Sequence, residues 1–145
     1  MAEMAISMAI ITIATIGAFN VFIQLIRSYN ATTLLRNASV EASTGLDRMV
    51  FGVGTNPGLR EAQATTVTIT TTSGWQIAYN TTLSFTYSTS KKSIVDQSGK
   101  NIATNVVTST LTNQTGGCQI SATVVESSSG RSFTNTMTTY VQFRN

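Results

Sequence analysis

The carboxylates of this chain are too few and too scattered to predict an active site. The sequence of 145 residues contains six Asp and Glu residues. Five of them stand singly along the chain: Glu41, Asp47, Glu61, Asp96 and Glu126. General acid–base catalysis needs such groups close together, and hard metal ions need several oxygen ligands. We therefore predict no catalytic residue, no metal site and no cofactor.

The other residue types that carry chemistry are equally scarce. The sequence has no histidine, so the usual general base and the usual transition-metal ligand are both missing. Cys118 is the only cysteine, which excludes an intrachain disulfide. The nine Lys and Arg residues are dispersed, and only Lys91 and Lys92 are adjacent. Because phosphate binding needs a basic cluster, we predict no nucleic-acid site, and we predict that the chain is not an enzyme.

Glu3 differs from the other carboxylates by its position. It is the only charged residue among the first 26, and it stands immediately before an uncharged run from Met4 to Ile26. One interpretation is an interfacial carboxylate that the positive end of a helix dipole favours. The other is a charge that must find a partner when the run is buried, because an unpaired carboxylate in apolar surroundings is costly. The residues alone leave both interpretations open.

The element that positions Glu3 is a predicted membrane-spanning helix over residues 1–26. As a helix, the run from Met4 to Ile26 is about 34 Å long, and the hydrocarbon layer is about 30 Å thick. Its apolar residues surround the whole circumference, which indicates lipid or protein on every side. Gly17 is its only glycine, and it marks either a point where the helix loosens or a close contact with another helix.

Beyond Ile26 the helix is expected to continue as an amphipathic segment over residues 27–51. Apolar residues recur there at steps of three and four, which is the spacing of one helix face. These residues are Leu35, Ala38, Ala42, Leu46 and Met49. A polar face follows the same steps through Asn37, Glu41, Thr44 and Arg48.

After the helix, residues 52–64 are expected to form a connecting loop, because they contain the only proline and several glycines. Residues 65–145 alternate in period two between turn signals, which predicts an antiparallel sheet. The fold class is therefore α+β, with the apolar half of one long helix exposed and its amphipathic half packed on a single sheet. The apolar sheet face is expected to consist of Val67, Ile69, Ile77, Leu83, Phe85, Ile120, Val124 and Val141.

The chain resembles type IV pilins and pseudopilins. The resemblance rests on the opening MAEMAISMAIITIATIGAF, on the segment LRNASVEASTGLDRMVFGVG followed by GLREA, and on the ending YVQFRN. It implies the structural subunit of an extracellular pilus, anchored in the membrane before assembly, and methylation of the chain. The implied partners are inner-membrane lipid, the pilus or secretion assembly machinery, and copies of the chain itself in a helical filament.

In such a filament the resemblance implies a core built from the N-terminal helices. The residues expected in that core include Met4, Ile10, Ile13, Phe19 and Phe22. It further implies that Glu3 pairs with the N-terminal amine of a neighbouring copy.

The N-terminal region departs from the family pattern in two ways. Glu3 lies two positions nearer the start than usual, so either two residues of the mature chain precede Met1 or this branch has a shorter head. Many pilins also have a proline in the apolar half, whereas here Gly17 is the only candidate for a helix break. Arg27 and Arg36 follow the span, and the positive-inside rule alone would place the domain in the cytoplasm. A basic leader removed after insertion would resolve that conflict.

Three alternatives remain beside a major filament subunit. The first is a minor pilin or a secretion-system pseudopilin. The second is a single-span anchored binding module, in which Trp75, Tyr79, Phe85 and Tyr87 would line an exposed ligand site. Alternating aromatic residues of this kind are more often the core of one sheet face, which is the favoured interpretation. The third is a secretory signal, which is disfavoured because the run lacks a basic region before it and is too long.

Four N-x-S/T sequons occur, and they indicate glycosylation only weakly because the chain is rich in Asn and Thr. They begin at Asn30, Asn37, Asn80 and Asn113.

Overall fold

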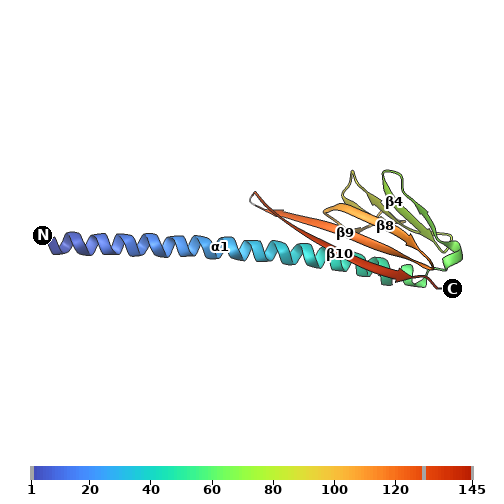
Figure 1. The fold of residues 1–145 in the computed structure, drawn as a ribbon, viewed down its shortest axis with the longest axis horizontal. Helices are drawn as coiled ribbons and strands as arrows, with labels where there is room; N and C mark the ends of the chain where they lie inside the picture. Colours follow the sequence, from blue (N-terminus) through green and yellow to red (C-terminus); the bar gives the residue numbers. More distant parts are fainter. Residues whose placement is uncertain (1, 129, 145) are drawn as a thin grey trace. The chain divides into compact units, whose positions relative to one another are not determined.

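A computed structural model of the protein describes residues 2–128 and 130–144. One helix, α1, runs from Ala2 to Phe51, and antiparallel strands follow it (Figure 1). The predicted α+β class, with one long N-terminal helix, is confirmed. The chain divides into two compact units: an N-terminal unit, Met1–Thr33, and a C-terminal unit, Leu34–Asn145.

In the described part of the N-terminal unit the chain is helical throughout. Its polar side chains are partly satisfied within the helix. Thr12 Oγ1 donates a hydrogen bond to the Met8 carbonyl, and Thr15 Oγ1 donates one to the Ile11 carbonyl, each at 2.8 Å. Such bonds allow a hydroxyl to lie in apolar surroundings without an external partner.

The segment after α1 contains more regular structure than the expected connecting loop. Strands β1 (Gly52–Val53) and β2 (Asn56–Pro57) form a short antiparallel hairpin. Two 3-10 helices follow, η1 (Leu59–Glu61) and η2 (Ala64–Thr66). Gly52 has a φ of 89°, and a Cβ there would lie 2.1 Å from the Asn56 carbonyl oxygen. Only glycine therefore fits the turn that ends the helix.

The strands form two larger sheets rather than one, so the prediction of a single sheet was wrong. The first sheet has the order β3-β4-β5-β6-β7 and the second has the order β10-β9-β8. The strands are β3 (Thr68–Thr70), β4 (Gly74–Tyr79), β5 (Leu83–Ser88), β6 (Ser93–Asp96), β7 (Asn101–Ala103), β8 (Val106–Gln114), β9 (Gly117–Ser128) and β10 (Arg131–Gln142).

The division into two sheets occurs between β7 and β8. Asn105, with a φ of 55°, turns the chain there, and β8 pairs with β9 instead of continuing the first sheet. Two side-chain bonds join the sheets: Trp75 Nε1 donates to Ser109 Oγ at 3.0 Å, and Tyr87 Oη donates to the Val107 carbonyl at 2.9 Å. The inner faces of both sheets are thus buried together.

The helix face predicted to pack on the sheets is confirmed at four of its five positions. Ala38, Ala42, Leu46 and Met49 are buried, but Leu35 is 49% exposed. Leu35 lies almost one turn before Ala38, the first buried position of the helix, and it receives no comparable cover.

On the sheet side, most of the predicted apolar face is in the core. Ile77, Phe85, Ile120, Val124 and Val141 are buried. The three other predicted members, Val67, Ile69 and Leu83, are only partly buried and pack at its margin.

Candidate functional site

The N-terminal helix exposes almost all of its large apolar side chains. The five residues expected in a filament core are all exposed, and they are Met4 (70%), Ile10 (62%), Ile13 (72%), Phe19 (63%) and Phe22 (57%). The most apolar part of the helix has no buried residue, and α1 is long and apolar enough to cross a membrane. An apolar surface of this size needs a cover of lipid or protein.

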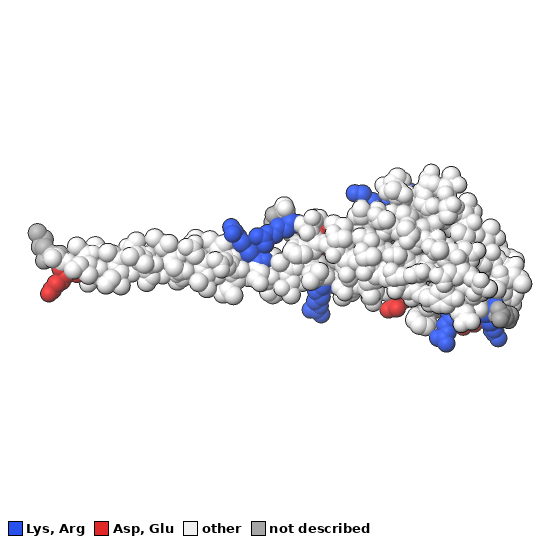
Figure 2. Space-filling model, viewed as in Figure 1, with Lys and Arg blue, Asp and Glu red and all other residues white. Residues whose placement is uncertain are grey.

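Glu3 is the one charged side chain among residues 2–26 of the helix. It lies exposed in the first turn of α1, where the helix dipole favours a carboxylate. Figure 2 shows a red side chain near the N-terminal end of the helix and an uncharged stretch after it. Gly17 lies within that stretch, the helix is continuous there, and a Cβ at Gly17 would meet no atom within 4 Å. Neither residue has a partner from another element among the described residues.

In the C-terminal unit, three helix residues hold the edge strand β7. Glu41 Oε1 accepts hydrogen bonds from the Thr104 N–H and from Thr104 Oγ1, each at 2.8 Å. Arg48 Nη1 donates to the Ile102 carbonyl at 3.3 Å. Between them, a Cβ at Gly45 would lie 2.6 Å from the Ala103 Cβ, so the glycine permits the close approach.

Glu41 and Arg48 were predicted on the polar face of the helix, and no role was predicted for Gly45. The structure places all three against β7 and Thr104. The spacing of four and three residues puts all three on one side of the helix. The signal was present in the sequence as a carboxylate, a glycine and a guanidinium at helical spacing. The strand that these helix residues contact, β7, lies in a polar stretch and was not predicted.

The remaining carboxylates each have a separate structural role or none. Glu61 forms an exposed ion pair with Arg144, with 3.6 Å between Oε2 and Nη1. Asp96 Oδ1 accepts bonds from the N–H groups of Ser98 and Lys100, both at 2.9 Å, and from Ser98 Oγ at 2.6 Å. Within residues 2–128 and 130–144, no three His, Cys, Asp or Glu residues are grouped to hold a metal ion.

Two buried groups have raised pKa values, and neither is placed for chemistry. Burial, together with the charge of Asp96, raises the pKa of Tyr79 to about 12. The Tyr79 hydroxyl donates to the Pro57 carbonyl at 2.7 Å, which fixes the β1–β2 hairpin to β4. Burial raises the pKa of the Cys118 thiol to about 11, so the thiol stays protonated and unreactive at neutral pH.

The four aromatic residues that an exposed ligand site would use are core residues. Trp75, Tyr79, Phe85 and Tyr87 are each 4% exposed or less. Their rings pack in pairs, with centroids 6.1 Å apart for Trp75 and Tyr87 and 5.7 Å apart for Tyr79 and Phe85. The favoured interpretation, that these aromatic residues are core, is confirmed, and the alternative that they line an exposed ligand site is wrong.

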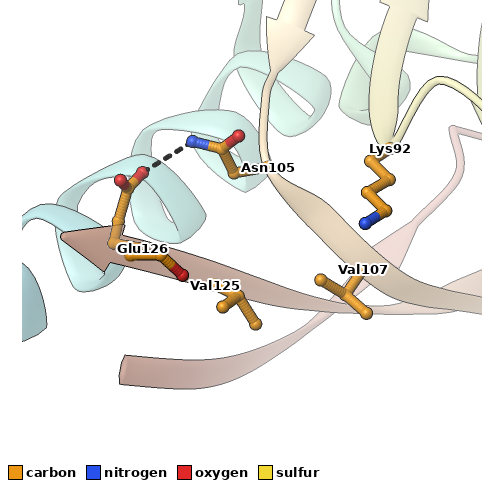
Figure 3. A pocket seen from close by; sticks show the side chains of 6 residues that line it. Lys92, Asn105, Val107, Val125 and Glu126 are labelled. Atoms are coloured by element: carbon orange, nitrogen blue, oxygen red, sulfur yellow. Dashed lines mark hydrogen bonds between the residues drawn. The ribbon is translucent and has the colours of Figure 1, made fainter. Parts of the chain in front are cut away.

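An open hollow lies where the two sheets join, and two of its polar side chains, Asn105 and Glu126, are bonded to each other (Figure 3). Asn105 Nδ2 donates to Glu126 Oε1 at 2.9 Å, and the Asn105 carbonyl accepts from the Val125 N–H at 3.0 Å. The Lys92 carbonyl accepts from the Val106 N–H at 2.9 Å. These bonds connect strands, and the hollow is a structural junction.

The structure separates the four sequons. Asn30, Asn37 and Asn113 are exposed. Asn80 is half-buried, and its amide is engaged: Nδ2 donates to the Glu61 carbonyl at 3.3 Å and Oδ1 accepts from the Gln63 N–H at 3.2 Å. These bonds give Asn80 a role in holding the segment between η1 and η2, and they argue against its modification.

Comparison with protein-family models, with curated proteins and with solved structures found no match to this chain. The feature that demands a functional explanation is the exposed apolar helix with Glu3 at its start.

Proposed function

We propose that this chain is the structural subunit of an extracellular, type IV pilus-like helical filament, assembled through its N-terminal helix. One observation carries the proposal. A helix with exposed apolar side chains on all sides precedes a unit that has a complete core of its own. That core contains no residue before Ala38, so the surface of the preceding part of the helix is available for lipid and for other copies.

The same helix suits both environments that such a subunit meets. Before assembly, its uncharged run lies in the membrane, where its backbone groups are satisfied internally. After assembly, the apolar side chains of parallel copies cover one another. The threonine hydroxyls of Thr12 and Thr15 are already bonded to the helix and add no cost in either state.

Glu3 is the exception, because a buried carboxylate is costly unless it is paired. In a filament its partner would be the N-terminal amine of a neighbouring copy, as the resemblance to pilins implies. This pairing would stabilise one register between copies, and other registers would leave the carboxylate of Glu3 unpaired.

A minor pilin or a pseudopilin would have the same helix, and only abundance in the filament distinguishes the cases. The test is electron microscopy of the purified native material, together with mass spectrometry of its composition. Filaments made mainly of this chain are expected. Filaments with only traces of it would identify a minor subunit or pseudopilin. A dispersed membrane protein with no filament would overturn the proposal.

A further inference from the structure

The helix face opposite the sheets in the C-terminal unit carries an exposed row of four residues. They are Arg36, Val40, Asp47 and Phe51, and we call them the outer row. Arg36 and Asp47 are exposed, Val40 is 54% exposed and Phe51 is 63% exposed. At 3.6 residues per turn, all four point away from the buried face that contains Ala38, Ala42 and Met49.

The outer row has a regular spacing. Asp47 follows Arg36 by eleven residues, and Phe51 follows Val40 by eleven residues. Eleven residues are about three helical turns, or about 16.5 Å along the axis. A parallel copy displaced by that distance would bring Arg36 level with Asp47, and the same displacement would bring Val40 level with Phe51.

Within residues 2–128 and 130–144, neither Arg36 nor Asp47 forms an ion pair. Among the described residues the one ion pair is that of Arg144 with Glu61. Glu41 and Glu126 line an open hollow with Arg36. These two carboxylates are hydrogen-bonded to Thr104 and Asn105 instead. Arg36 and Asp47 are three turns apart and cannot reach each other on one helix.

We propose that the outer row is the surface on which a second copy of this chain packs, displaced by about three helical turns, with Arg36 of one copy paired to Asp47 of the next. The inference rests on the proposed function, since it requires parallel copies. In a helical filament every copy presents the same helix face toward the axis, and the face opposite the sheets is the one free to do so. The two matched offsets, one of opposite charges and one of apolar side chains, favour a second copy over any other occupant.

The test is charge exchange in the full chain. Arg36→Asp and Asp47→Arg each place like charges side by side at every contact. Each variant is expected to reduce filament yield at least about tenfold. The double variant, Arg36→Asp with Asp47→Arg, restores opposite charges and is expected to return the yield to near that of the parent.

Matched controls separate assembly from folding. Lys91→Asp makes the same charge change as Arg36→Asp on an exposed loop and is expected to leave the yield unchanged. Val40→Asn is expected to reduce the yield, whereas Val107→Asn, at a valine 41% exposed on β8, is not. All these side chains are exposed or half-exposed, so the thermal midpoint of the C-terminal unit should stay within a few degrees of the parent.

The outcomes distinguish the two proposals. If the parent forms filaments and the single variants do too, or if the double variant assembles no better than the singles, the outer row is not the contact and the filament proposal stands. If the parent forms no filament under any condition, the proposed function fails, and this inference fails with it.

Discussion

At the scale of single residues, Glu3 is the charged side chain that most needs a partner in the proposed filament, because a buried carboxylate is costly unless it is paired. We expect Glu3→Ala to leave a folded, membrane-inserted protein, because the C-terminal unit has its own core. Filament yield should fall sharply, because the pairing that sets register between copies is lost. Electron microscopy of sheared filaments measures the yield, and Glu61→Ala, which removes an exposed carboxylate, is the control. Normal filaments from the Glu3 variant would show that Glu3 acts only by its favourable interaction with the helix dipole.

The lowered pKa of Asp96 makes the stability of the fold depend on pH. Burial raises the pKa of its carboxyl, but the bonds from Ser98 and Lys100 and the charge of Lys100 outweigh burial and hold the pKa below its usual range. A lowered pKa stabilises the fold above the unfolded value of about 3.9, and this contribution is lost as the pH falls through the folded value.

Asp96→Asn should therefore destabilise the fold at pH 7 by about 1–2 kcal/mol, because the charged acceptor in the turn is lost. As the pH falls through the lowered folded pKa, the parent carboxylate becomes protonated as well, and the difference should shrink. Urea unfolding at several pH values measures the difference. A difference that stays constant throughout the acidic range would mean that the Asp96 charge contributes nothing.

At the scale of elements, the packing of α1 on the sheets gives a directional prediction. Leu46 is 4% exposed, and Leu46→Asp puts an unpaired charge in the core, which should cost about 3–5 kcal/mol. Asn37 is exposed on another side of the helix, and Asn37→Asp should cost less than about 0.5 kcal/mol. Thermal unfolding of the detergent-solubilised full chain compares them. The reverse order of stabilities would show that the helix faces the other way.

The periodicity of the sequence was enough to predict this helix face and most of the strands. Alternation in period two is strong in β4, β5 and β9, where apolar residues point into one core. It is absent in β7, because only Ile102 and Ala103 are buried there and polar residues surround them. Residues 88–105 were predicted to be a loop around one short strand at residues 93–95, which is β6. Because β7 was not predicted, the second sheet was not foreseen.

The role of Gly45 could not be predicted from the periodicity of the sequence either. A glycine in a helix usually lowers stability, and the sequence gives no sign of the side chain that needs its space. That information lies in Ala103, a residue on a distant strand. Leu35 is the opposite case. It is apolar and has the spacing of the buried helix face, but the buried positions of the helix begin only at Ala38.

At the scale of the whole molecule, the exposure of the N-terminal apolar run could be predicted from the sequence more fully than the details of the fold. Charge-free length and apolar residues on every side are properties of composition, and they do not depend on tertiary contacts. The exposed helix of the N-terminal unit carries the residues that the sequence predicted for it. What covers them is a property of the assembly, so the filament contacts of Glu3, Gly17 and the outer row remain predictions.

At Gly17 the helix is expected to behave differently in its two environments, the membrane and the filament. In the membrane every backbone group must be bonded within the helix, since no water is present to replace a lost bond. In a filament this constraint is relaxed, and a glycine in a helix interior costs up to about 1 kcal/mol relative to alanine. The hydroxyl of Thr15, now bonded to Ile11, can then turn to a freed backbone group. We therefore expect the helix to loosen locally around Gly17 on assembly.

Hydrogen exchange measured on the same chain in detergent micelles and in filaments tests this expectation. Amides within about one turn of Gly17 should exchange faster in the filament than in the micelle. Those near Ala38 and Ala42, which lie in the core of the C-terminal unit, should stay protected in both. Gly17→Ala should restore slow exchange in the filament, because alanine removes the helix penalty and its Cβ would meet no atom within 4 Å in the isolated chain. An unbroken, fully protected helix from Met4 to Val50 in the parent filament would show that Gly17 serves close packing between helices instead.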